Sequence, residues 1–343
     1  MLFSTERLDV RMLVASDADV VAAYRNDPAV NAMQDWDLPY TPERARDRLA
    51  AQAHLTGPTA GEWVNLGVVL RDGPDAGTLI GDLACHLDDT ASVAEIGYTL
   101  RTEFQGKGYA SEGAGALVDH LLATTGIHRI EASLDTANVP SMRVLEAIGM
   151  QFETLTRQSY PLRGRWDDDL RYAMLREDRA KWLARPSTPP STLELVELTP
   201  DDAWRWDALR THHSQRRFVA PMAQSFRDAL YPEIIDGAPV VPWLRGVLAD
   251  DERAGFVMIA EATAHHPEPY LWRLLIDRMH QRRGLGSRVI AMLQATADAQ
   301  GHRSLLTSWV EGPGSPAPFY ARLGFVPTGN IVGEHEVEGR LSW

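Results

Sequence analysis

Two glycine-containing loops carry the residues with the clearest chemistry in this sequence. Residues 105–110 read Gln-Gly-Lys-Gly-Tyr-Ala, residues 281–286 read Gln-Arg-Arg-Gly-Leu-Gly, and each loop precedes an amphipathic helical pattern. Amides at a helix N-terminus lack partners within the helix and lie at the positive end of its dipole. Glycine lets an anion approach these amides, and lysine or arginine adds charge. Both loops therefore predict a pyrophosphate site, with an ordinary loop-to-helix turn as the alternative.

The two loops belong to a longer repeat. Each is followed by a short helical segment that ends in glycine, at Gly149 in the first half and at Gly324 in the second. Gln105 lies 44 positions before Gly149, and Gln281 lies 43 positions before Gly324. Matched spacing of this kind indicates a duplicated domain.

The domain boundary is expected near the middle of the chain. With 343 residues, the chain suits two domains of roughly 150 residues each. Proline and hydroxyl residues at 185–191 interrupt both helical and strand periodicity, which is typical of a linker. We expect an N-terminal domain at 1–184, a linker at 185–191 and a C-terminal domain at 192–343.

Hydrophobic periodicity predicts the elements that position the loops. In the first half, strands are expected at 8–14, 63–71, 79–87, 94–100 and 130–134, and helices at 17–25 and 141–147. In the second half, strands are expected at 193–198, 243–248, 254–260 and 270–276, and a helix at 202–211. In each half, strands that resemble an antiparallel sheet precede a strand, loop, helix, strand, helix unit. The pattern indicates a mixed α/β fold, present twice.

Composition narrows the class of partner. The chain has 34 basic and 47 acidic residues, a formal net charge of −13, which disfavours nucleic acid and favours a cationic small molecule or basic peptide. The single cysteine, Cys85, excludes an internal disulfide and a multi-cysteine zinc site, so we expect no metal and a cytoplasmic location. No apolar run approaches the roughly 20 residues of a membrane span. We expect no membrane partner and either a monomer or a homodimer.

The loop sequence Q-x-x-G-x-[GA], with L-G-[FM] or a close variant about forty positions on, resembles the GNAT superfamily of acetyl-CoA-dependent N-acyltransferases. The first half is similar to ribosomal-protein alanine N-acetyltransferases in segments 5–8, 95–98, 106–112 and 138–146. The second half is similar to bacterial diamine and polyamine N-acetyltransferases in segments 215–221, 274–277 and 318–320. The resemblance implies two GNAT folds in tandem. Each would be a mixed, mostly antiparallel sheet flanked by helices, with a splayed central strand pair.

The resemblance also implies a co-substrate, acetyl-CoA, whose pyrophosphate binds the loops. The expected cofactor-binding residues are Gln105, Gly106, Lys107, Gly108, Tyr109 and Ala110 in the first half, with Asn138, and Gln281, Arg282, Arg283, Gly284, Leu285 and Gly286 in the second.

Alignment of the two terminal glycines places Tyr320 opposite Leu145. In the family a tyrosine here is the usual general acid for the leaving CoA thiolate, and leucine cannot replace it. A packing role for the Tyr320 ring is the alternative. In the first half, the resemblance implies that the Ser141 hydroxyl takes this role and that Asn138 contacts pantetheine or substrate. Helix capping is the alternative for both residues.

A general base is harder to assign from sequence. Glu95, on the strand before the first loop, is a plausible base, whereas Glu112 at a helix N-terminus is expected to be structural. Asp277 and Glu336 are the candidates in the second half, and a solvated charge is the favoured interpretation of both.

The sequence therefore predicts transfer of acetyl from acetyl-CoA to a primary amine of a small cationic acceptor, polyamine-like or an amine-bearing antibiotic. The C-terminal half carries the stronger catalytic signature because it contains Tyr320. One alternative is acetylation of a protein or peptide N-terminus. Another is that one half is a non-catalytic CoA-binding or regulatory module.

Overall fold

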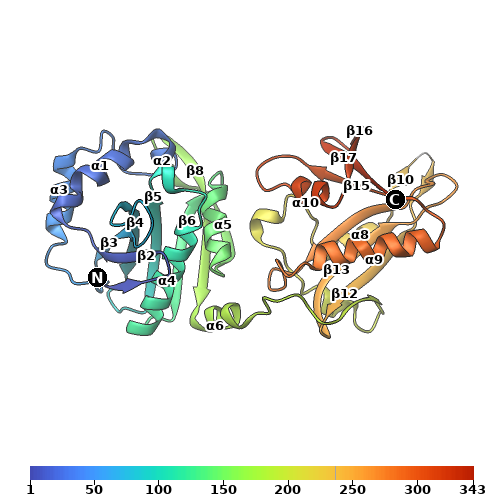
Figure 1. Cartoon of the computed structure of the whole chain (residues 1–343), viewed down its shortest axis with the longest axis horizontal. Helices are drawn as coiled ribbons and strands as arrows, with labels where there is room; N and C mark the ends of the chain where they lie inside the picture. The colour runs from blue at the N-terminus through green and yellow to red at the C-terminus, as the bar shows by residue number, and fades with distance from the viewer. Residues whose placement is uncertain (236) are drawn as a thin grey trace. The chain divides into compact units, whose positions relative to one another are not determined.

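The chain folds into two compact units, Met1–Leu183 and Ala184–Trp343, called here the N-terminal and C-terminal units (Figure 1). The computed structural model describes residues 1–235 and 237–343. Within these residues, the strands form an eight-stranded sheet in the N-terminal unit, a seven-stranded sheet in the C-terminal unit and a separate two-stranded ribbon. The same residues contain no helix with the length and apolar character needed to span a bilayer.

The N-terminal sheet has the order β1-β2-β3-β4-β5-β6-β8-β7. Its strands are β1 (Phe3–Ser4), β2 (Leu8–Met12), β3 (Trp63–Leu70), β4 (Leu79–Leu87), β5 (Val93–Leu100), β6 (Arg129–Asp135), β7 (Gln151–Leu162) and β8 (Arg165–Leu175). The helices of the unit are α1 (Ala18–Asn26), α2 (Pro28–Asn31), α3 (Pro42–Ala51), α4 (Tyr109–Thr124), α5 (Val139–Ala147) and α6 (Arg176–Ala184).

The C-terminal sheet has the order β16-β17-β15-β14-β13-β12-β9. Its strands are β9 (Leu193–Glu197), β12 (Pro242–Ala249), β13 (Glu252–Ala260), β14 (Tyr270–Ile276), β15 (Ser304–Val310), β16 (Val326–Val332) and β17 (Glu336–Ser342), and β10 (Ile234–Ile235) pairs with β11 (Ala238–Pro239). The helices are α7 (Ala203–Trp206), α8 (Met222–Leu230), α9 (Leu285–Ala299) and α10 (Ala317–Arg322).

One parallel strand pair interrupts each otherwise antiparallel sheet. β5 pairs with β6 at three registers, the last being Glu95 with Glu131, although β5 continues to Leu100. β14 pairs with β15 at two registers, the last being Leu271 with Thr307. Beyond these registers the parallel strands separate. The predicted fold, two mixed sheets with a splayed central pair, is confirmed.

The helices after the two loops are amphipathic, as expected, and bury their apolar faces. In α4, Leu117, Val118 and Leu121 are fully buried, and the helix packs on β2, β4 and β5. In α9, Val289 and Leu293 are buried, and the helix packs on β9, β14 and β15. These contacts fix the start of each helix beside the splayed strands.

Two local expectations were wrong. The helix expected at 202–211 ends at Trp206, because the Arg210 amide donates to the Asp277 carboxylate at 2.8 Å instead of continuing the helix. The first strand ends at Met12 rather than Val14, because the Val14 amide donates to Asp17 at 2.8 Å and the chain turns. In both places a side-chain carboxylate provides the backbone amide with a competing partner.

Candidate functional site

The two glycine-containing loops adopt the same backbone conformation. Gly106 and Arg282, the second residues of the loops, have φ angles of 72° and 63°. Gly108 and Gly284, the fourth residues, have φ angles of 83° and 77°. The repeat in sequence is therefore a repeat in geometry, although one left-handed position is occupied by arginine.

The glutamine that opens each loop ties it to the preceding strand. The Gln105 Nε2 donates to the Leu100 carbonyl at 2.9 Å, and the Gln281 Nε2 donates to the Ile276 carbonyl at 3.0 Å. Each bond reaches five residues back, to the end of β5 or β14. The side-chain amides of both glutamines thus hold the loop in place, while the backbone of the loop remains available to a ligand.

Helices α4 and α9 begin without a capping side chain. Their N-caps are Gly108 and Gly284, both left-handed and both without a side-chain hydrogen bond to the first turn. By contrast, Thr41 caps α3 and Asn138 caps α5. The first amides of α4 and α9 therefore retain their capacity for an anion. A Cβ at Gly284 would have no atom within 4 Å, so the space above this loop is open, as a pyrophosphate requires.

The left-handed Arg282 predicts a measurable strain. A residue with a Cβ in this conformation costs roughly 1–2 kcal/mol. We expect Arg282→Gly to raise the free energy of unfolding by about 1 kcal/mol in urea denaturation of the whole chain. Arg282→Ala retains the Cβ and serves as the matched control, with an unchanged midpoint. Equal midpoints for the two variants would contradict strain at this position.

The two basic side chains of the second loop have different environments. Arg282 is exposed and lines the cavity described below. Arg283 is 3% exposed, and its guanidinium donates to the Thr188 carbonyl at 2.7 Å and to Asp250 at 3.1 Å. The Arg283 side chain therefore anchors the 185–191 segment, and Arg282 is left as the cation of this loop. The Leu285 side chain likewise belongs to the core, at 2% exposure.

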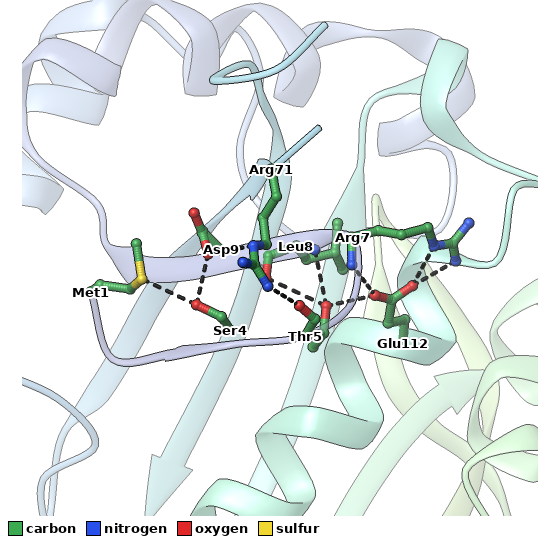
Figure 2. A network of polar contacts seen from close by, with 8 residues as sticks. All are labelled: Met1, Ser4, Thr5, Arg7, Leu8, Asp9, Arg71 and Glu112. Atoms are coloured by element: carbon green, nitrogen blue, oxygen red, sulfur yellow. Dashed lines mark hydrogen bonds and ion pairs between the residues drawn. The ribbon is translucent and has the colours of Figure 1, made fainter. Parts of the chain in front are cut away.

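Next to the first loop, the turn between β1 and β2 contributes Arg7, which is ion-paired with Glu112 (Figure 2). The Arg7 guanidinium donates to the Lys107 carbonyl at 3.0 Å, and it lies 4.5 Å from the centre of the Tyr109 ring. Glu112 accepts from the Arg7 Nε at 2.6 Å and from the Thr5 hydroxyl at 2.5 Å, and Figure 2 shows both contacts as dashed lines. Burial alone would raise the pKa of Glu112, but these hydrogen bonds outweigh it and lower the pKa. Glu112 is thus a structural residue of the loop.

The C-terminal unit contains a cavity of about 1370 Å³ beside its loop. The lining includes Gln281, Arg282, Gly284 and Gly286 from the loop, Thr307, Ser308 and Trp309 from β15, Tyr320 from α10, and Tyr270 and Glu336 from β14 and β17. Single-ligand pockets occupy roughly 300–1,000 Å³. The volume therefore accommodates a long co-substrate arm and a second molecule together.

Tyr320 lies within the wall of this cavity. Its ring stacks on Trp309, with centroids 5.5 Å apart and an interplanar angle of 23°, and the side chain is 8% exposed. Burial raises the pKa of Tyr320 to about 12, although a hydrogen bond with Thr307 acts in the opposite direction. The phenol is therefore held rigidly and remains a proton donor at neutral pH.

Leu145 occupies the position of Tyr320 in the N-terminal unit. The Met150 amide donates to the Leu145 carbonyl at 3.0 Å, and the Phe325 amide donates to the Tyr320 carbonyl at 3.1 Å. Since both helices end with the same bond, the two side chains are structurally equivalent. Leu145 is 1% exposed and belongs to the core.

Two other hydroxyl and amide groups gather at the start of α5. The Asn138 side chain accepts from the Ser141 amide at 3.2 Å, so Asn138 caps the helix. The Ser141 carbonyl accepts from the Tyr98 hydroxyl at 2.9 Å, across from β5. Burial raises the pKa of Tyr98, which keeps its phenol protonated. Tyr98 is a phenol beside Ser141 that sequence reasoning missed, because it comes from a different element than Tyr320.

Glu95 lies where β5 and β6 begin to separate. It is half-buried, opposite Glu131 on β6 and His86 on β4. Burial raises the pKa of Glu95, and the neighbouring Glu131 adds to this effect while Arg171 opposes it. A carboxyl group with a raised pKa at the splay fits the general-base role expected of Glu95, which stays a prediction.

Asp277, a candidate base of the second half, binds backbone amides. Both of its oxygens accept backbone amides, from Arg210 and from Met279, each at 2.8 Å. Asp277 therefore terminates β14 as a structural cap, while Glu336 lines the cavity. Among residues 1–235 and 237–343, no group of three or more His, Cys, Asp or Glu side chains is arranged to hold a metal ion.

Comparison with known proteins identifies the family. Residues 7–151 match the family model described as an acetyltransferase (GNAT) domain, and residues 203–325 match the model described as the acetyltransferase (GNAT) family. The uncharacterized N-acetyltransferase p20 of Bacillus licheniformis is 30% identical over 178 residues, which are 51% of this chain and 97% of that protein. The chain belongs to the GNAT acetyltransferase family.

Further relatives of this GNAT protein have the same range of similarity. The uncharacterized N-acetyltransferase YnaD of Bacillus subtilis is 30% identical over 52% of this chain and 99% of its own length. A solved GNAT-family acetyltransferase from Bacillus anthracis is 29% identical, with a TM-score of 0.44 over 51% of this chain and 98% of that chain. The tandem arrangement of two GNAT domains, predicted from the repeat together with the family resemblance, is confirmed, and the protein is an acyltransferase of a family that uses acetyl-CoA.

Proposed function

We propose that the chain transfers acetyl from acetyl-CoA to a primary amine of a small cationic acceptor, and that the C-terminal unit performs this transfer. The observation that carries the proposal is the position of Tyr320, which lines the same cavity as the 281–286 loop. Acetyl-CoA supplies an activated thioester. The uncapped amides of α9 and the exposed Arg282 bind its pyrophosphate, and Tyr320 donates a proton to the leaving thiolate.

Among the described residues, the lining of the cavity contains five glutamates and five arginines, and a group of these glutamates supports a cationic acceptor. Glu268, Glu334, Glu336 and Glu338 contribute to its lining, and the chain has a net charge of −13. Carboxylates along a cleft concentrate cations and orient them. Polyamine-like molecules and amine-bearing antibiotics have this charge.

An acceptor screen tests the proposal. The whole chain is incubated with acetyl-CoA and one candidate at a time, drawn from diamines, polyamines, aminoglycosides and peptides, and released CoA is measured with a thiol reagent. We expect the small cationic amines to give the fastest release. Release with peptides alone would favour N-terminal acetylation instead.

Salt dependence gives an independent prediction. The Debye length falls from about 30 Å at 0.01 M salt to about 8 Å at 0.15 M, so attraction between the acidic protein, with its net charge of −13, and a cation weakens. We expect kcat/KM for the cationic acceptor to decrease steadily over this range, as measured by initial rates. A neutral amine of similar size is the control, and an equal response of both substrates would contradict electrostatic attraction.

The N-terminal unit supports a second candidate function. Its loop is as well formed as the other, and Glu95 and Ser141 lie near the splayed strands. Together with the resemblance of this half to ribosomal-protein acetyltransferases, these residues favour acetylation of a peptide or protein N-terminus. Leu145, at the position of Tyr320, favours instead a unit that binds acetyl-CoA without transferring its acetyl group.

A further inference from the structure

Ser308 and Glu336 form a hydrogen-bonded pair on the wall of the C-terminal cavity. Trp309 packs on Tyr320 on one face of β15, and because side chains alternate along a strand, Ser308 lies on the other face. Glu336 is opposite Val310, which shares the face of Ser308. The Ser308 hydroxyl donates to the Glu336 carboxylate, and both residues line the cavity that contains Tyr320.

Tyr270 extends this pair into a chain of three groups. Its hydroxyl donates to the Ser308 oxygen at 2.6 Å, and Tyr270 is the first residue of β14 that pairs with β15. Burial raises the pKa of Tyr270 to about 12, so the phenol remains a donor to Ser308. The hydrogen bonds therefore run in one direction, from Tyr270 through Ser308 to Glu336. The Oε2 atom of Glu336 is fixed by this chain, which orients the carboxylate in the cavity that Ser308 and Glu336 both line.

The same pair is present in the N-terminal unit. Where β6 pairs with β8, Ser133 is opposite Arg171 and Asp135 is opposite Asp169. Where β15 pairs with β17 in the other unit, Ser308 is opposite Glu338 and Val310 is opposite Glu336. Asp169 thus occupies the position of Glu336, and it is hydrogen-bonded to Ser133, the counterpart of Ser308. Burial raises the pKa of Asp169. Because strands pair through backbone groups, the sheet itself has no need of a serine and a carboxylate at this place in both units.

We propose that Glu336 accepts the proton of the attacking amine, with Ser308 and Tyr270 as its positioning residues, and that Asp169 has the same place in the N-terminal unit. This inference rests on the proposed acetyl transfer. The amine nitrogen forms a bond to the acetyl carbon, and the carbon–sulfur bond breaks. The proton of the amine goes to Glu336, and the proton of Tyr320 goes to sulfur.

The proton balance closes within the cavity. After transfer, Glu336 is protonated and Tyr320 is a phenolate, so the proton of Glu336 returns to Tyr320 through solvent in the cavity that both residues line, and both groups regain their starting state. A phenol with a pKa of about 12 donates a proton uphill to a thiolate, since a simple thiol such as that of cysteine has a pKa of about 8.5. Because the carboxylic acid of Glu336 is a stronger acid than the Tyr320 phenol, the return of its proton to the phenolate is favourable and offsets the uphill step. No further reactant is required.

The test separates proton transfer from simple binding of a cation. The probe is 1,4-diaminobutane, or the amine that the screen ranks highest, with the whole chain and acetyl-CoA. Glu336→Gln preserves size, and we expect kcat to fall about 10²- to 10⁴-fold with little change in the acceptor KM. Binding of acetyl-CoA, measured by calorimetry, is expected to remain as in the wild type. Ser308→Ala is expected to lower kcat about tenfold, and Ser308→Thr to restore it.

Glu338→Gln is the matched comparison, since Glu338 lies two residues along β17 and bonds to Thr328 at 2.6 Å. Here we expect a higher acceptor KM with kcat retained. A Glu336→Gln variant that also keeps kcat within about threefold of the wild type overturns the inference. Transfer lost in Asp169→Asn alone overturns the assignment to Glu336. A wild-type chain that releases no CoA with any screened amine contradicts the proposed function, and the inference with it.

Discussion

Replacement of Tyr320 by phenylalanine is expected to lower kcat about 10²- to 10⁴-fold, equivalent to roughly 3–5 kcal/mol of barrier. The variant keeps the ring that stacks on Trp309 and removes only the hydroxyl. Packing, stability and acetyl-CoA affinity should therefore change little. Initial rates with the best acceptor, together with calorimetric binding of acetyl-CoA, measure the two effects separately.

Ser141→Ala is the corresponding change in the N-terminal unit. The Ser141 amide and carbonyl, which bond to Asn138 and Tyr98, are backbone groups and survive this substitution. If the N-terminal unit transfers acetyl to its own acceptor, that activity should fall while the Tyr320-dependent activity persists. Unchanged transfer in Tyr320→Phe with loss in Ser141→Ala would show that the N-terminal unit is the enzyme.

The parts of the site that could be predicted from the sequence are local in the chain. Each pyrophosphate loop consists of consecutive residues, so glycine spacing and the following amphipathic pattern suffice to place it before α4 or α9. Tyr320 was found in the same way, because it lies a fixed distance before Gly324. Short-range backbone geometry determines both features.

The parts that could not be predicted depend on strand register. Ser308 and Glu336 are far apart in the chain and meet only because β17 pairs with β15 at one register, in which Val310 is opposite Glu336. A shift by one residue would turn the carboxylate to the other face of the sheet. Tyr270 lies on a third strand, β14, so its contact with Ser308 depends in addition on how β14 pairs with β15. The alternation of side chains along a strand indicates on which face of the sheet a residue lies, but it does not tell which strand is the neighbour.

Arg283 shows that the role of a long side chain is hard to predict from its position in a loop. Its type and its place in the loop favour phosphate binding, and Lys107 at the equivalent position is exposed. In the structure the Arg283 guanidinium is buried against Thr188, Asp250 and His280. A side chain as long as arginine reaches partners from distant segments. Its position in a loop therefore determines where its backbone lies but not where its guanidinium charge lies.

Two acetyl-CoA molecules are expected to bind each chain, one at each loop. Both loops present uncapped helix amides, and each has an exposed cation, Lys107 or Arg282. In Gly108→Ala or Gly284→Ala, a Cβ would occupy the space that the pyrophosphate needs. Loss of hydrogen bonds to a charged group costs about 1.5–3 kcal/mol, or roughly 10- to 150-fold in affinity. Calorimetric titration should give one remaining strong site in either variant and none in the double variant.

Matched glycines separate this effect from backbone strain. Gly301, just beyond the end of α9, and Gly164, in the turn between β7 and β8, have φ angles of 89° and 83°, and a Cβ at either would have no atom within 4 Å. Gly301→Ala and Gly164→Ala therefore introduce the same left-handed alanine away from the loops, and both should retain two sites. If Gly284→Ala also retains two sites, the second loop has only a structural role. In that event Tyr320 would lie in a cavity that acetyl-CoA does not enter through this loop, and the assignment of catalysis to the C-terminal unit would fail with it.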